Sequence, residues 1–109
     1  MMKFAPEAQL TAIIDDWSAY YIDRTRAVMD GTWESVDVWG GMGDKMVIMA
    51  DYTNMPDDVK AMAEETEARI TSGEFHPFTG PIYKQNGDLA VAEGEVLDDG
   101  SLLGMNWYV

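Results

Sequence analysis

The stretch from Pro56 to Gly73 constrains the fold more than any other part of the sequence. Proline at a first helical position, followed by two aspartates in the positive first turn, predicts the start of a helix. Gly73 is placed to end it, and Glu65 can reach Arg69 one turn on. Charged residues occupy one face of this helix, and residues three and four apart form a stripe on the other. The stripe consists of Val59, Met62, Ala63, Thr66 and Ile70.

Shorter patterns predict strands and helices on both sides of this helix. The β-branched run 10–14 reads as a strand that emerges at a sheet edge, and residues 17–31 read as a helix that Gly31 ends. Residues 33–52 predict two short strands around a glycine-rich break at 40–43. Segments 81–85 and 88–92 flank Asn86 and Gly87 as a β-hairpin, and a short helix follows at 101–105. This alternation predicts an α/β fold.

Composition limits the classes of function. The 109 residues predict one domain, residues 1–109, and 20 acidic against 7 basic side chains give a net charge of -13. Such a charge disfavours nucleic acid and anionic membranes as partners. The absence of cysteine excludes disulfides and thiolate chemistry, and no cofactor is predicted. The start of the chain, residues 1–7, has no signal-peptide pattern, so we expect the chain as given to be cytoplasmic and without membrane insertion.

Asp15, Asp16 and Trp17 are the candidate binding residues, because they follow a predicted strand and precede a helix. Ligands of α/β proteins bind at the carboxyl ends of strands. The alternative for the two aspartates is helix capping, with one carboxylate accepting backbone N–H groups. Trp17 has helical spacing with Tyr20 and Tyr21, so packing is the alternative to stacking on a flat ligand.

Other motifs predict structure rather than chemistry. Residues 40–43 lack the further residues of a dinucleotide or phosphate-binding loop and predict a flexible turn. His76 is the only histidine, and a triad or zinc site needs partners for it, so a structural role is favoured. Most of the aromatic residues and the nine methionines are expected in the core.

Several blocks of the sequence resemble the basic membrane protein (BMP) family of ABC-transporter substrate-binding lipoproteins, several of which bind purines or purine nucleosides. The two most specific blocks are 72–82 and 102–109, and the others are 4–6, 10–12, 20–22, 28–33, 39–41 and 46–47. The resemblance implies the C-terminal third of a two-lobed protein, namely part of a Rossmann-like lobe of the type I periplasmic-binding-protein class. It also implies an ABC permease as the partner of the full-length protein, and a periplasmic or membrane-anchored location for the family.

Two positions depart from that family's pattern. The family's ligand contact after the strand, often Lys or Trp, falls on Asp15, and Asp16 and Trp17 lie beside it. Lys45 stands where the family usually has Gly. Only one wall of the cleft is expected, so a small-molecule ligand such as a purine nucleoside should bind weakly.

Three hypotheses follow from the sequence. The first is a non-catalytic part of an ABC importer's solute-binding protein, arising as a natural truncated reading frame or by design. The second is a small homodimeric interaction module, because an incomplete lobe exposes sheet edges and apolar surface. The third, acid–base catalysis by Asp15 and Asp16, is the least favoured, since no complementary base, metal or oxyanion donor is evident.

Overall fold

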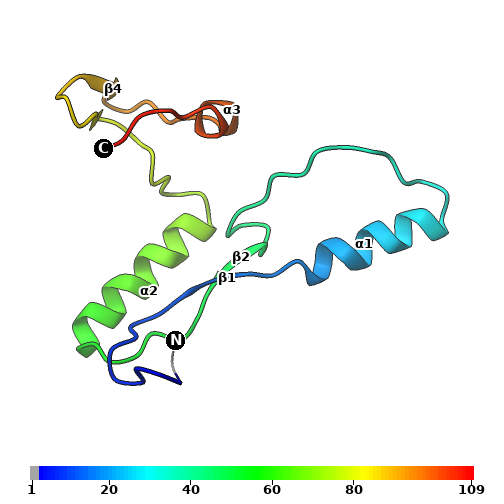
Figure 1. Ribbon diagram of the computed structural model, residues 1–109, viewed down its shortest axis with the longest axis horizontal. Coiled ribbons are helices and arrows are strands. Elements are labelled where there is room, and N and C mark those ends of the chain that lie inside the picture. Colours follow the sequence, from blue (N-terminus) through cyan, green and yellow to red (C-terminus); the bar gives the residue numbers. More distant parts are fainter. Residues whose placement is uncertain (1–2) are drawn as a thin grey trace.

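The computed structural model describes residues 3–109, and Met1 and Met2, which the single-domain prediction includes, lie outside the described residues. Three helices and two pairs of short strands alternate along the chain (Figure 1), which confirms the α/β class. The elements are β1 (Ile13–Asp15), α1 (Ser18–Met29), β2 (Val47–Met49), α2 (Asp57–Thr71), β3 (Ile82–Tyr83), β4 (Leu89–Val91) and α3 (Asp99–Leu103). Each pair forms its own antiparallel two-stranded sheet, β1 with β2 and β3 with β4.

The β1–β2 ladder joins the start of the chain to its middle. Its register pairs Ile13 with Met49 and Asp15 with Val47. Hydrogen bonds extend it beyond the strands, from Ala50 N–H to the Ala12 carbonyl at 2.8 Å and from Thr53 N–H to the Leu10 carbonyl at 2.7 Å. The predicted strand at 10–14 is therefore confirmed, although its regular part is displaced toward the aspartates.

Helix α1 ends as the sequence predicts, at a left-handed glycine. Gly31 has φ 68°, and its N–H donates to the Val28 carbonyl at 3.2 Å. The Thr32 N–H reaches back to the Ala27 carbonyl at 2.9 Å. This pair of bonds is the Schellman arrangement, in which glycine avoids the steric cost that a Cβ would bring at positive φ.

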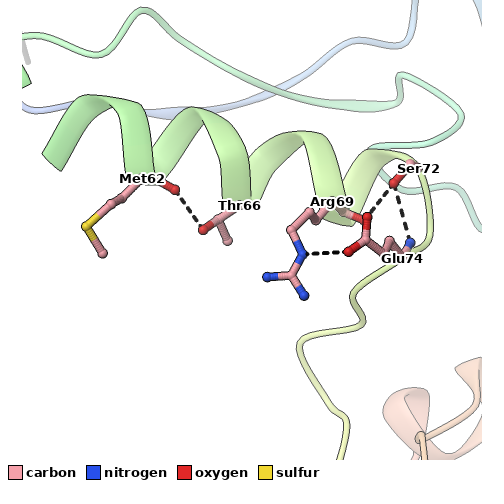
Figure 2. Close-up of polar contacts among 5 residues, drawn as sticks. All are labelled: Met62, Thr66, Arg69, Ser72 and Glu74. Atoms are coloured by element: carbon pink, nitrogen blue, oxygen red, sulfur yellow. Dashed lines mark hydrogen bonds and ion pairs between the residues drawn. The ribbon is translucent and has the colours of Figure 1, made fainter. Parts of the chain in front are cut away.

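Helix α2 begins and ends where its sequence predicts, but one expected ion pair differs. Arg69 pairs with Glu74, Nε to Oε1 at 3.1 Å, and not with Glu65 (Figure 2). Ser72 Oγ donates to the Arg69 carbonyl at 3.1 Å, so the chain turns back over the helix end and carries Glu74 within reach of the guanidinium. Contacts beyond the helix end thus replace the expected i,i+4 pair.

The segment between α1 and β2 corrects one prediction. Of the two strands expected within 33–52, only β2 forms, and residues 33–39 are exposed and in no strand. In Figure 1 this segment arches away from the β1–β2 pair. A strand needs a neighbour to satisfy its backbone donors and acceptors, and β-propensity alone does not supply one.

Residues 79–109, called here the C-terminal unit, form the best-packed part of the molecule. The predicted hairpin is confirmed, with Lys84 N–H donating to the Asp88 carbonyl at 2.8 Å across the turn. The end of the chain returns along it, where Gln85 N–H donates to the Tyr108 carbonyl at 3.0 Å. Val91 of β4 is 2% exposed and is the one buried hydrophobic residue of the chain from 3 to 109.

Residues 3–72, called here the N-terminal half, leave their apolar surface open. Among the described residues, only the strands of each pair make close element-to-element contact, so neither α1 nor α2 packs its backbone against a sheet. The accessible surface is 8600 Å², whereas a folded monomer of this mass exposes about 6,100 Å². The radius of gyration is 17.9 Å, against about 13 Å for a packed domain of this length.

Candidate functional site

The β1–β2 ladder places the predicted binding residues beside the glycine-rich turn. Asp15 ends β1 opposite Val47, and the Asp16 N–H donates to the Met46 carbonyl at 2.9 Å. Asp15 is exposed and Asp16 is half-buried. Two segments that are about 30 residues apart in sequence therefore lie next to one another, because an antiparallel ladder brings the end of one strand to the start of the other.

Asp16 caps the start of α1, as one of the two alternatives predicted. Its Oδ1 accepts from the Ser18 N–H at 3.0 Å. Hydrogen bonding by the Ser18 side chain, and then by its backbone, lowers the pKa of Asp16 below the ordinary value of an aspartate. Asp16 is therefore charged at neutral pH and held in place, which leaves the Asp15 carboxylate as the freer acceptor at this edge.

Trp17 opens an aromatic cluster on the first turns of α1. Its ring meets Tyr20 edge-on with centroids 5.5 Å apart, and Tyr21 at 6.3 Å. The Arg24 guanidinium lies 5.7 Å from the centre of the Tyr20 ring, and its buried Nε has no hydrogen-bond partner in residues 3–109. Trp17 remains 42% exposed, so part of this large apolar ring stays open to solvent. The cluster can offer a flat ligand a stacking surface beside two carboxylates.

The expectation that most aromatic residues form a core is wrong for this chain. Trp17, Trp33 and Trp39 are all more than 40% exposed, and Trp107 is half-buried. Their helical or strand-like spacing correctly indicates one-sided segments. The described chain does not supply the opposite surface that would bury those sides.

The residues 40–45 form a turn, as predicted, and not a phosphate cradle. The Gly41 N–H donates to Asp44 Oδ2 at 3.2 Å, and the Met46 N–H donates to the Gly41 carbonyl at 3.1 Å. Lys45 has φ 60°, a backbone region that glycine occupies without steric cost. The turn thus uses its own backbone donors to close on β2, next to Asp16.

His76 has a local structural role. Its Nδ1 accepts from the Phe78 N–H at 3.2 Å, and its carbonyl accepts from Thr79 Oγ1 at 2.7 Å. These bonds fold residues 76–79 into the turn that leads to the C-terminal unit. The prediction of a structural histidine is therefore confirmed.

A groove beside α2 is the feature that the sequence reasoning missed. It has a volume of about 510 Å³, and its walls come from the α2 stripe, β2 and the two flanking loops. Sequence analysis identified the stripe but assigned it to a core. The lining residues are Met42, Met49, Tyr52, Val59, Met62, Ala63, Thr66, Glu67 and Ile70.

The polar rim of this groove joins α2 to the end of β2. Burial of the Tyr52 hydroxyl, followed by its hydrogen bond to Glu67, raises the pKa of Tyr52 above its ordinary value. Lys60 Nζ lies 3.7 Å from Glu64 Oε1 on the same side. The neutral phenol and the two methionines make the floor of the groove apolar, and charged groups line its edge.

Two further searches cover residues 3–109. They contain no group of three or more histidine, cysteine, aspartate or glutamate side chains placed to hold a metal ion. No helix in this part of the chain has the length and hydrophobicity to cross a bilayer.

Comparisons with known proteins give two relatives among curated proteins. Over all 109 residues the chain is 62% identical to a purine-binding protein of Brucella abortus (strain 2308), and it covers 31% of that protein's length. It is also 27% identical over 89 residues, or 81% of the chain, to a putative ABC transporter glucose-binding protein of Haloferax volcanii, covering 23% of that protein. The chain thus spans less than a third of either relative. No family model matches it.

Proposed function

We propose that this chain supplies part of the ligand-binding body of a solute-binding protein that serves an ABC importer, with a purine base or nucleoside as the solute. The observation that carries the proposal is the 62% identity with the Brucella purine-binding protein across every residue of the chain. The Haloferax relative supports the same general role with a sugar as ligand. The resemblance to the BMP family leads to the same expectation, in which the chain corresponds to the C-terminal third of a two-lobed protein with a Rossmann-like lobe.

The open surface of the N-terminal half supports a part of a larger body. One chain exposes about 2,500 Å² more than a folded monomer of its mass would. An amphipathic helix with an uncovered stripe and a two-stranded sheet with free edges are expected where the remainder of a lobe would pack. In this proposal the rest of the binding protein covers these surfaces.

The ligand contacts that we propose are Asp15 and Trp17. The exposed Trp17 face would stack on the purine ring, and the Asp15 carboxylate would accept an N–H of the base. Asp16 would orient the pair from its bond to Ser18, 3.0 Å long. Binding needs no proton transfer, so we propose that the protein binds its solute without catalysis.

A chimera tests the proposal. The 109 residues of this chain replace their matched segment in the Brucella protein, and calorimetric titration with adenine, guanine, adenosine, guanosine and glucose measures binding. We expect purine or nucleoside binding without glucose binding. A folded chimera that binds none of the purine compounds would contradict the proposal.

Two single substitutions in this chimera locate the contact. Trp17→Ala should weaken purine binding at least tenfold, because it removes the stacking face. Trp33→Ala is the matched control, since Trp33 is similarly exposed but lies in the 33–39 segment outside the site. Equal losses in both variants would remove Trp17 from the site.

A further inference from the structure

We propose that the groove beside α2 is the contact surface of a homodimer, in which the α2 helices of two copies pack antiparallel along their apolar stripes. This inference concerns the chain on its own and does not depend on the proposed function. Val59 and Met62 on the stripe are 45% and 68% exposed, and the groove they line measures about 510 Å³. Figure 2 shows the Met62 side chain extended away from the α2 backbone.

The uncovered area is sufficient for such a dimer. Each chain exposes about 2,500 Å² beyond what a folded monomer of its mass would. Stable homodimers bury about 2,000–5,000 Å² in total, or half of that on each copy. The groove, with its stripe and the two methionines from β2 and the glycine-rich turn, is the most apolar part of this surplus in the N-terminal half.

The charges beside the stripe favour an antiparallel pair. A helix turns about 100° per residue, so Lys60 and Glu67 flank one side of the stripe, and Asp58 and Arg69 flank the other. An antiparallel two-fold pair centred between residues 63 and 64 places Lys60 opposite Glu67 of the second copy. It also places Asp58 opposite Arg69 of the second copy, so that two-fold symmetry gives four opposite-charge pairs.

A parallel pair is disfavoured at the helix starts. It would bring the two acidic first turns together, Asp57 and Asp58 from each copy, where both helix dipoles also present their positive ends to one another. The antiparallel pair separates these turns by the length of the helix. The net charge of -13 opposes any self-association, so the apolar stripe supplies the attraction.

Light scattering coupled to gel filtration tests the surface, at about 0.15 M salt where screening acts over about 8 Å. We expect a dimer at tens of micromolar chain concentration. Met62→Glu should shift it to monomer by raising the dissociation constant at least 30-fold. Ala68→Glu adds the same charge to the opposite face of α2 and should leave the dimer intact.

A charge exchange tests the orientation. Asp58→Lys alone and Arg69→Glu alone should each weaken the dimer, because each creates two like-charge pairs. A mixture of the two variants should restore it, since every pair in the mixed dimer is again of opposite sign. Circular dichroism of each variant, compared with the wild type at equal concentration, checks that the helices are retained.

Three results would overturn the inference. A monomeric wild-type chain at tens of micromolar, a dimer that survives Met62→Glu, or a mixture that does not recover would each contradict it. None of these results bears on the purine titration of the chimera, so failure of one proposal is distinguishable from failure of the other.

Discussion

The C-terminal unit and the N-terminal half differ in where their packing partners lie in the sequence. In the C-terminal unit, β3 and β4 are joined by a short turn, and Val91 is buried by residues of the same unit. In the N-terminal half, β1 and β2 lie more than 30 residues apart, and both long helices keep their apolar sides exposed. A unit with local partners can complete its own packing, whereas one-sided helices depend on a surface from elsewhere.

The largest expected effect comes from the closest backbone approach in the C-terminal unit. A Cβ at Gly80 would overlap the carbonyl group of Ala92. Gly80→Ala should therefore destabilise the C-terminal unit by about 2–3 kcal/mol, the usual cost of overpacking. Residue-resolved hydrogen exchange should show lower protection at the amides of Lys84 and Gly94, with α2 unchanged.

Gly100→Ala is the control for this substitution. A Cβ there meets no atom closer than 3.6 Å, and alanine is the better helix former within α3. A loss of protection in α2 on Gly80→Ala would show that the two regions unfold together, and the contrast between them would then fail.

The next effect concerns the buried valine. Val91→Ala should cost about 2 kcal/mol, because it removes two buried methyl groups and leaves a cavity. Leu89 lies on the same strand but is 53% exposed, so Leu89→Ala should cost about 0.5 kcal/mol or less. Chemical denaturation followed by Trp107 fluorescence measures both values. Equal costs would mean that the C-terminal unit has no core of its own.

The smallest effect is the acid response of two helix starts, one in each region. Asp16 accepts from Ser18 before α1, and Asp98 accepts from the Ser101 N–H at 2.7 Å before α3. Hydrogen bonding by these serines lowers the pKa of both carboxylates. A lowered folded-state pKa gives stabilisation that is present above the unfolded value, about 3.9, and is lost as the pH falls through the folded one.

We therefore expect both helix starts to fray only below about pH 4, as the unfolded-state value of aspartate sets the upper limit of the window. Carbon-detected NMR titration of the two carboxyl groups measures it, and Asp16→Asn should abolish the response at α1 alone. If Asp16 titrates at the ordinary value while Asp98 does not, capping would depend on the better packing of the C-terminal unit.

Much of the local structure could be predicted because its causes are local. Gly31 and Gly73 end their helices, Asn86 and Gly87 make the hairpin turn, and Asp16 caps α1. The missing strand at 33–39 has a physical reason, since extended backbone becomes a strand only when another strand pairs with it. The Arg69–Glu74 pair likewise depended on how the chain turns after α2.

The candidate site could be predicted only in part. The sequence correctly placed Asp15, Asp16 and Trp17 between a strand and a helix, while their roles as ligand contacts stay a prediction. It did not show that the 40–45 turn lies beside them, which follows from the pairing of Asp15 with Val47. It also did not show the groove, because a stripe of spaced apolar residues looks the same whether or not something covers it.

The sequence by itself determined the elements that arise from neighbouring residues, namely the helices with their ends, the β-hairpin and the acidic charge of the chain. The tertiary structure alone decided which distant segments meet, that β1 pairs with β2, and that the stripes of α1 and α2 remain open. The reason is that caps and turns depend on interactions a few residues apart, whereas burial depends on whether a complementary surface lies within reach in space.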